Sequence, residues 1–489
     1  MTKFLQISLA PISLAPISLA PILLALVLLA MNGVGFAPPA IGETLGDALR
    51  NAYSNNPSLN SGRANLRAVD EGVPIARAGM RPRVSVNSYL GAQQNRFVQR
   101  QEDLGIPDDP NRTTVWNLQE GRSVARSAGV TIEQPIFDGF KAKNTMSAAE
   151  SAVFAERQRL RFLEQKVLFD TAAAYMNVLR DTAALKLQEN NVSVLTEQLR
   201  QTKERFEAGQ ITLTDTAQAQ SRLAGGQAQE SASRAMLEAS IGVFRQLVGQ
   251  LPKKLAAAAP LDKLLPRTLD EAERIAVSEH PMILAALHDA DASDFDIKSI
   301  ESDFLPKLSI VADVFTQTNI NTIYDRNIAG MIGGRLNIPL YDGGSTSAQL
   351  RQAKEIAGKK KLDADVARAE IASLTRATWA NLQSAKTRIG TAQTQIAAAE
   401  RALYGVREEA KAGLRTTLEI LNAQQELLNA RIALIVAQRE RVVASYGLMA
   451  SIGRLSIENL GVASDYYEPT HHFNQVKDSW GGGATSTGR

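Results

Sequence analysis

A pattern of apolar residues at seven-residue spacing runs through the middle of the chain. Residues 141–208 contain neither proline nor glycine, and apolar side chains recur at every seventh position of their second half, at Val178, Leu185, Val192, Leu199 and Phe206. A seven-residue repeat is typical of helices that supercoil left-handed around partner helices. The pattern therefore predicts one very long helix, roughly 100 Å in length at 1.5 Å per residue.

The same pattern returns 204 residues later, at Leu382, Ile389, Ile396, Leu403 and Ala410. Each long stretch ends at a glycine, Gly209 or Gly413, which threonines and an acidic residue follow. Glycine readily takes the left-handed conformation that ends helices, and Thr with Asp or Glu caps the helix that comes next. We therefore expect two antiparallel helical hairpins, over about 141–248 and 345–452.

The two hairpins belong to a duplication that covers most of the chain. Thr44 matches Thr268 at an offset of 224, and the motif at Pro135 matches the one at Pro339 at an offset of 204. The first copy therefore carries 20 extra residues (224 − 204) between these points. A repeat accepts insertions where a loop lies at the surface, so we expect a surface loop within the polar stretch 93–121.

Each repeat also contains two extended segments that partly alternate apolar and polar residues. They cover about 83–96 and 123–135 in the first repeat, 41–267, and about 307–319 and 328–339 in the second repeat, 268–460. Lengths near ten residues suit tilted strands that cross a membrane, although soluble hairpins have a similar pattern. Four strands cannot close a barrel, and an open sheet edge in lipid leaves amides unsatisfied. Membrane insertion would therefore require several chains, and three chains would supply about twelve strands.

The two ends of the chain differ from the repeats. Lys3 precedes an apolar run that prolines interrupt, and small residues follow it. This order predicts a secretory signal peptide over 1–40 rather than a membrane anchor, because the uninterrupted apolar core is too short to span a bilayer comfortably. The polar tail, 461–489, is expected to be disordered.

Composition argues against several function classes. The 489 residues carry a net charge of +3 without a basic block, which argues against nucleic acid as a partner. There are no cysteines, and therefore no disulfides or thiolate metal sites. No nucleophile elbow, phosphate-binding glycine loop or metal-spaced His/Glu cluster occurs. We therefore expect no enzyme activity, no cofactor and no metal.

Two short motifs carry a resemblance to a known family. They are Pro135-Ile136-Phe137-Asp138-Gly139 and Pro339-Leu340-Tyr341-Asp342-Gly343. Proline lacks an amide donor and suits the end of a strand ladder, and Asp138 and Asp342 can cap the helix that follows. With the duplicated halves and the glycine turns, these motifs resemble the strand-to-helix junctions of the TolC family.

The resemblance implies an α+β membrane protein in the outer membrane of a Gram-negative bacterium, with most of its mass in the periplasm. It implies a homotrimer whose twelve-strand barrel continues into a twelve-helix periplasmic tunnel. The implied function is an exit duct for drug efflux pumps, for type I protein secretion, or for both. The implied partners are outer-membrane lipid, periplasmic adaptor proteins that dock at the hairpin turns Gly209 and Gly413, and inner-membrane RND or ABC transporters.

The resemblance also implies a gate at the hairpin turns. In the family an Arg there links to Thr and Asp on the neighbouring hairpin, and acidic rings narrow the pore. Arg415, Thr214 and Asp215 occupy the matching positions, while Glu419 and Asn422 replace two aspartates. Three copies would therefore place three carboxylates at the ring instead of six, which weakens the attraction for cations. The family often has a gate Tyr where this chain has Ala410.

Two other interpretations compete with the duct. A periplasmic adaptor also carries a helical hairpin, but the hairpin here is duplicated and lacks flanking small β-domains. A coiled-coil scaffold without a pore would share the long helices. Without the resemblance, Arg415 is read as an ordinary solvated turn residue and Glu419 as a first-turn acid that the helix dipole favours.

Overall fold

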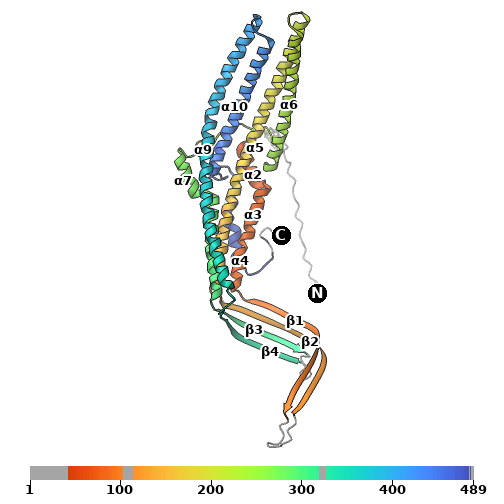
Figure 1. Ribbon diagram of the computed structural model, residues 1–489, viewed down its shortest axis with the longest axis vertical. Coiled ribbons are helices and arrows are strands. Elements are labelled where there is room, and N and C mark those ends of the chain that lie inside the picture. The colour runs from red at the N-terminus through yellow and green to blue at the C-terminus, as the bar shows by residue number, and fades with distance from the viewer. Residues whose placement is uncertain (1–41, 103–113, 319–325, 484, 486–489) are drawn as a thin grey trace, which may run out of the picture.

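Long helices make up most of the molecule, and a four-stranded sheet extends from one end of them (Figure 1). A computed structural model describes residues 42–102, 114–318, 326–483 and 485. The signal peptide expected at 1–40 lies outside these residues. No helix in the described part of the chain is long and apolar enough to cross a membrane.

Both repeats have the same order of elements, except that one helix of the second repeat takes the place of two successive helices in the first. The first half contains α2 (Leu45–Asn55), α3 (Pro57–Asp70), α4 (Gly72–Arg77), the 3-10 turn η1 (Ala78–Met80), β1 (Arg83–Glu102), β2 (Thr114–Phe137), α5 (Lys141–Glu207) and α6 (Leu213–Val248). The second half contains α7 (Leu269–Glu279), α8 (Pro281–Glu301), the 3-10 turn η2 (Ser302–Phe304), β3 (Lys307–Thr318), β4 (Arg326–Asn337), α9 (Ser345–Lys411) and α10 (Thr417–Ser451). A last helix, α11 (Pro469–Val476), follows the second half.

Helices α5 and α9 have 67 residues each, and α6 and α10 return antiparallel to them. The turns between them contain Gly209 at φ 71° and Gly413 at φ 79°. Both return helices begin with a capping box, in which the side chain of Thr212 or Thr416 accepts a hydrogen bond from the helix backbone. The structure thus has the two hairpins that the heptad pattern and the turn residues predict.

The four strands form one antiparallel meander in the order β1-β2-β3-β4. The strands β3 and β4 have 12 residues each, whereas β1 has 20 and β2 has 24. The prediction of a surface loop within 93–121 is wrong for residues 93–102 and 114–121, which belong to β1 and β2. Most of the extra residues continue the strand ladder, from Gln93 paired with Ser123 to Glu102 paired with Thr114. Polar residues do not prevent strand pairing when they alternate along a ladder. Residues 103–113, the rest of the stretch, lie outside the described residues.

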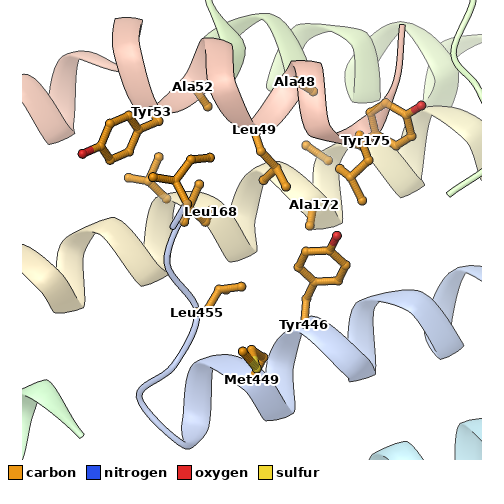
Figure 2. Close-up of a cluster of buried hydrophobic side chains, with 14 of the residues drawn as sticks. Ala48, Leu49, Ala52, Tyr53, Leu168, Ala172, Tyr175, Tyr446, Met449 and Leu455 are labelled. Atoms are coloured by element: carbon orange, nitrogen blue, oxygen red, sulfur yellow. The ribbon is translucent and has the colours of Figure 1, made fainter. Parts of the chain in front are cut away.

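A buried cluster joins the two repeats near the middle of the long helices. Figure 2 shows side chains of α2, α5, α10 and the segment after α10 converging there, among them Leu49, Leu168, Tyr446 and Leu455. Tyr175 is fully buried in this cluster. Burial of such side chains contributes about 1.5–3 kcal/mol each, so the cluster fixes the hairpins to one another at this level.

The C-terminal region was expected to be disordered, but the structure describes it up to residue 483 and finds a helix there. Residues 469–476 form α11, which packs against α3, and His472 Nδ1 lies 3.0 Å from a carboxylate oxygen of the buried Asp70. The side chain of Glu468 caps α11 by accepting from the amide of Thr470. A polar segment therefore orders here because its hydrogen-bonding groups meet partners on α3, 402 residues away in the sequence.

Candidate functional site

One face of the sheet is apolar along all four strands. The register aligns Val84 with Ile132, Val130 with Val314, and Ala312 with Ile332. Large apolar side chains on this face are exposed in the single chain at Val84, Val86, Leu90, Val124, Val130, Ile132, Ile310, Val314, Ile328, Ile332 and Leu336. The opposite face carries mainly polar and small residues, including Ser85, Asn87, Thr131, Asp313 and Gln317. A sheet with one exposed apolar face and one polar face suits a boundary between lipid and water.

Both edges of the sheet are free among the described strands, because β1 pairs only with β2 and β4 pairs only with β3. A four-stranded meander has first and last strands that run in opposite directions. The β4 edge of one copy can therefore accept the β1 edge of another copy and continue the antiparallel order. Free edges of this kind are templates for pairing with a further chain.

The junction motifs connect the sheet to the long helices. Pro135 lies at a β-bulge between β2 and β3, and Pro339 follows β4. Asp138 Oδ2 accepts a hydrogen bond of 2.7 Å from the amide of Ala142, and Asp342 Oδ2 accepts one of 2.7 Å from the amide of Thr346. The hydroxyl of Thr346, which also donates to Asp342, together with the Thr346 amide holds the pKa of the Asp342 carboxyl below its usual value. The two aspartates thus satisfy free amides at the starts of α5 and α9.

The glycines of these motifs adopt left-handed conformations. Gly139 has φ 72° and Gly343 has φ 73°. At Gly139 an added Cβ would lie 2.6 Å from the carbonyl oxygen of Ser302, so a side chain is excluded there on two grounds. No described residue lies within 4 Å of the corresponding point at Gly343, where only the conformation favours glycine. The close approach in the first repeat is the contact between the start of α5 and the end of α8.

The hairpin tip of the second repeat contains a charged cluster centred on Arg415. Its Nε donates to Glu409 at 2.7 Å and its Nη1 donates to Glu419 at 2.8 Å. These hydrogen bonds raise the pKa of Arg415, and the amide of Thr416 together with Arg415 lowers the pKa of Glu419. Arg415 and Glu419 are therefore brought together on one hairpin.

Thr214 and Asp215 lie on the other hairpin tip, and in the part of the chain that the structure describes no hydrogen bond joins them to Arg415. Asp215 instead accepts from the hydroxyl of Thr212 at 2.7 Å, which lowers the pKa of its carboxyl. Each tip thus completes its own local hydrogen bonds within a single chain. A link between the two tips remains an expectation for the assembled protein.

Asn422 has a neighbour that the sequence did not indicate. Arg222 Nη2, on α6, donates to Asn422 Oδ1 on α10 at 2.7 Å. The two residues are 200 apart, not the 204 that relates the repeats, so the duplication gave no signal for this contact. It places a cation directly beside the neutral amide and connects the two return helices near their tips.

The comparison with known proteins agrees with this arrangement. The family model described as outer membrane efflux protein matches residues 48–250 and 274–454, which is most of both repeats. The chain belongs to the outer membrane efflux protein family. Members of this family are outer-membrane channels, and catalysis is not their function. The alternatives of an adaptor or of a scaffold without a pore find no support in this match.

Named relatives extend across both repeats. The outer membrane efflux protein BepC of Brucella suis biovar 1 is 36% identical over 460 residues, covering 92% of this chain and 94% of BepC. The outer membrane protein TolC of Escherichia coli K12 is 25% identical, covering 87% of this chain and 85% of TolC. The alkaline protease secretion protein AprF of Pseudomonas aeruginosa is 25% identical, covering 81% of this chain and 82% of AprF.

Solved channels share the fold at low sequence identity. The Campylobacter jejuni CmeC outer membrane channel superposes with a TM-score of 0.70 at 15% identity, covering 89% of each chain. The Vibrio cholerae outer membrane protein VceC gives a TM-score of 0.64 at 20% identity, covering 84% of this chain and 96% of VceC. The chain is thus an outer-membrane exit channel of the efflux and type I secretion class, with most of its mass in the periplasm.

Proposed function

We propose that three copies of the chain form one duct, in which a twelve-strand barrel in the outer membrane continues into a twelve-helix tunnel in the periplasm. The observation that carries this proposal is the sheet, whose one apolar face and two free edges are unsatisfied in a single chain. In lipid, unpaired edge groups cost several kcal/mol each, so the edges must be paired by other copies. Four strands from each of three copies give a barrel of about twelve strands, which leaves room for a passage.

The helical part offers matching support for neighbouring copies. Large apolar side chains on α9 are exposed in the single chain, at Ile356, Leu362, Val366 and Leu374. On α6, Met236 and Val243 are exposed as well. Apolar stripes on long helices are typical of coiled-coil contacts. A ring of hairpins would cover these stripes in the same assembly that closes the sheet.

Disulfide trapping tests the assembly, and the absence of native cysteines removes any background. Met331→Cys on β4 is combined in turn with a cysteine replacing Ser85, Asn87 or Tyr89 on β1, which lie on the same face of the sheet. Because disulfides need Cβ atoms about 4 Å apart, only the correct register between copies will react. We expect oxidised outer membranes to give, for one of these pairs, a covalent ladder that ends at three chains.

The matched control combines Met331→Cys with Thr131→Cys on β2, a strand that is paired on both sides. This pair should give no linked chains. A ladder that ends at two chains, one that continues beyond three, or no ladder in any of the three registers would contradict the proposed trimer.

The names of the relatives guide the proposed partners. BepC and AprF are named for efflux and for alkaline protease secretion, so we propose that this duct receives cargo from an inner-membrane RND or ABC transporter through a periplasmic adaptor. The exposed hairpin turns at Gly209 and Gly413 are the proposed docking points. In the part of the chain that the structure describes, no atom lies within 4 Å of the point where a Cβ would stand on either glycine, which leaves both turns open to a partner.

The cluster around Arg415 is the proposed gate. In the trimer, its guanidinium would exchange part of its bonding to Glu409 and Glu419 for Thr214 and Asp215 of a neighbouring hairpin and hold the tips together. Arg415→Ser removes the cation and leaves two acids, and we expect a higher conductance in planar bilayers, because like charges then repel across the tip.

Lys411→Ser is the matched control, since Lys411 is an exposed cation of the same tip and, among the described residues, bonds only Glu408 one turn away. Its conductance should equal that of the wild type. If Arg415→Ser also conducts like the wild type, Arg415 does not close the duct.

A further inference from the structure

The C-terminal strap, defined here as residues 463–480, runs along the outside of the helices that precede β1. Its carbonyl at Ala463 accepts from Arg50 Nε, and its amide at Tyr467 donates to the hydroxyl of Tyr53 on α2 at 3.1 Å. Further on, His472 bonds the buried Asp70 of α3. The strap therefore follows one face of the protein, from α2 along α3 toward the sheet.

The strap ends beside the first strand of the sheet. Asp478 forms an ion pair with Arg77, and the carbonyl of Ser479 accepts from the guanidinium of Arg81. The Arg81 guanidinium lies 4.7 Å from the centre of the Trp480 ring, within the range of a cation–π contact. These contacts fix the position of Trp480, although its side chain remains 74% exposed.

Trp480 and Arg81 border a cleft of about 600 Å³. Its charged lining residues are Arg81, Arg83 and Lys141 against one carboxylate, that of Asp138. Asp138 is occupied by the Ala142 amide, and Lys141 by Asp303. Within the described residues Arg83 has no ion pair, even though Glu133 stands opposite it in the strand register. The cleft is therefore cationic and contains a guanidinium without a carboxylate partner.

The cleft lies at the boundary between the polar helices and the apolar sheet. Strand β1 begins at Arg83, two residues after Arg81, and its first apolar side chains are Val84 and Val86. They are 65% and 75% exposed in the single chain. An exposed Trp beside Arg at such a boundary combines an apolar ring with groups that bind phosphate. Trp and Tyr are enriched at this level of membrane proteins because their rings suit the headgroup region.

We propose that Trp480, together with Arg81, binds phospholipid headgroups of the periplasmic leaflet and anchors the base of the duct to the membrane surface. The Trp480 ring lies among the glycerol and upper acyl groups, and the Arg81 guanidinium binds a lipid phosphate. This inference rests on the proposed membrane insertion of the sheet, and it adds a lipid contact made by a segment outside both repeats. This contact gives the ordered structure of the strap a role, because the strap holds the Trp480 ring at the level of the lipid headgroups.

Fluorescence of Trp480 tests the contact, because the chain has only three tryptophans. The full chain with Trp116→Phe and Trp379→Phe is reconstituted into phosphatidylcholine vesicles with bromine either near the headgroup or deep in the acyl chains. We expect strong quenching of Trp480 by shallow bromine, weaker quenching by deep bromine, and a blue-shifted emission relative to detergent-free denatured chain. Quenching by aqueous iodide alone would overturn the proposal, as would shielding from both quenchers, which would place Trp480 in a contact between subunits.

Two control positions separate this proposal from the proposed function. In a chain without other tryptophans, Ile332→Trp on the apolar sheet face should be quenched by deep bromine, and Tyr404→Trp near a hairpin tip by iodide only. If Ile332→Trp responds as expected and Trp480 does not, the lipid contact is wrong and the inserted sheet stands. If Ile332→Trp is not quenched by lipid, membrane insertion itself fails.

Arg81→Gln provides a second measurement. It removes the cation over the Trp480 ring and should abolish the preferential quenching by shallow bromine, while the signal of Ile332→Trp is unchanged. The substitution Trp379→Phe changes a side chain that packs against the buried cluster. A variant that avoids this change is Trp480→Cys, labelled with an environment-sensitive fluorophore in the otherwise unaltered chain, which gives the same readout. Unchanged shallow quenching in Arg81→Gln would show that the arginine does not position the ring.

Discussion

At the scale of single residues, Tyr175 joins segments that lie far apart in the sequence. Its ring is fully buried, and its hydroxyl lies 2.7 Å from the carbonyl oxygen of Glu43 and 2.6 Å from that of Ala256. The first carbonyl belongs to the segment before α2 and the second to the segment between α6 and α7. Glu43 and Leu255 also form an isolated β-bridge there. The hydroxyl therefore secures both segments to α5.

Tyr175→Phe should destabilise the fold by about 1–3 kcal/mol, because the substitution leaves the carbonyl oxygen of Ala256 without its donor. The carbonyl oxygen of Glu43 still accepts from the amide of Ala256 at 3.0 Å. Denaturant unfolding in detergent measures the loss. Tyr446→Phe is the control, since Tyr446 is also buried in the same cluster and its hydroxyl makes no hydrogen bond within the described residues. Equal losses for the two variants would show that the bonds to Glu43 and Ala256 contribute little.

The same tyrosine gives a pH dependence with a defined sign. Burial, the first cause, raises the pKa of Tyr175 from 10.0 to about 12. A group whose folded-state pKa is raised contributes stability in full below its unfolded pKa, and this contribution is lost as the pH rises through the folded value. Between pH 10 and about pH 12 the wild type should therefore lose more stability than Tyr175→Phe. A difference between the two proteins that does not change over this window would contradict the assignment.

Local residue chemistry was predictable from the sequence, and distant contacts were not. The capping threonines and acids, such as Thr212 with Asp215, act within three residues of each other, and their types alone indicate the bond. The pair of His472 with Asp70 joins positions 402 apart, and Arg222 with Asn422 joins positions 200 apart. Such pairs depend on how helices are staggered in space, which no local pattern encodes.

At the scale of elements, the repeats end their return helices with matched glycines in different surroundings. Gly249 after α6 has φ 87°, and Gly453 after α10 has φ 80°. An added Cβ at Gly249 would meet only Asn55 at 3.9 Å, whereas at Gly453 it would lie 2.8 Å from the Cα of His280. The sequence aligned the two glycines, but only packing distinguishes them.

Both glycine-to-alanine substitutions should destabilise the protein, and Gly453→Ala should do so more. A left-handed conformation costs a residue with a Cβ about 1–2 kcal/mol, which applies equally to Gly249→Ala and Gly453→Ala. Only Gly453→Ala adds a clash with the backbone at the cap of α8. Thermal unfolding of the two variants in detergent measures the difference, and equal midpoints would show that α10 and α8 move apart without cost.

Element boundaries were predictable where glycine, proline and capping residues mark them. The expected hairpins over 141–248 and 345–452 agree closely with α5 to α6 and α9 to α10. The extra residues of β1 and β2 were predicted to form a loop, because polar residues obscure a strand pattern. These residues are held by pairing between β1 and β2, which a local pattern does not reveal. The order of α11 was missed because eight residues of polar sequence carry no signal without the surface of α3.

At the scale of the whole molecule, the duplication explains why one chain is incomplete. Each repeat supplies two strands and one hairpin, and the two repeats together still leave β1 and β4 with free edges and α9 with an exposed apolar stripe. The sequence predicted this need for further copies, because four strands cannot close. The side of the tunnel on which each tip residue lies depends on the assembly, and a single chain therefore carries the gate only in part.

The contact of Arg222 with Asn422 leads to a prediction for the whole proposed duct. The neutral Asn422 and the adjacent cation should make block by trivalent cations weak in the wild type, measured as the loss of conductance in planar bilayers. Asn422→Asp adds three carboxylates to the trimer, each worth about 1 kcal/mol to a charge at about 4 Å in water. Arg222 offsets part of this attraction, so block should strengthen only moderately in Asn422→Asp and further when Arg222→Ala is added.

Asn429→Asp is the matched control for this series, because Asn429 is exposed on the same helix and bonds Gln425 rather than a cation. This substitution adds the same charge to α10 farther from the tip. Block of its conductance by trivalent cations should therefore stay close to that of the wild type. Tight block in the wild type that disappears only when Asn422 is changed would contradict a neutral ring. Equal block in Asn422→Asp with and without Arg222→Ala would show that the arginine turns away from the pore in the assembled duct, so that the tip's cation affinity is set by Glu419 alone.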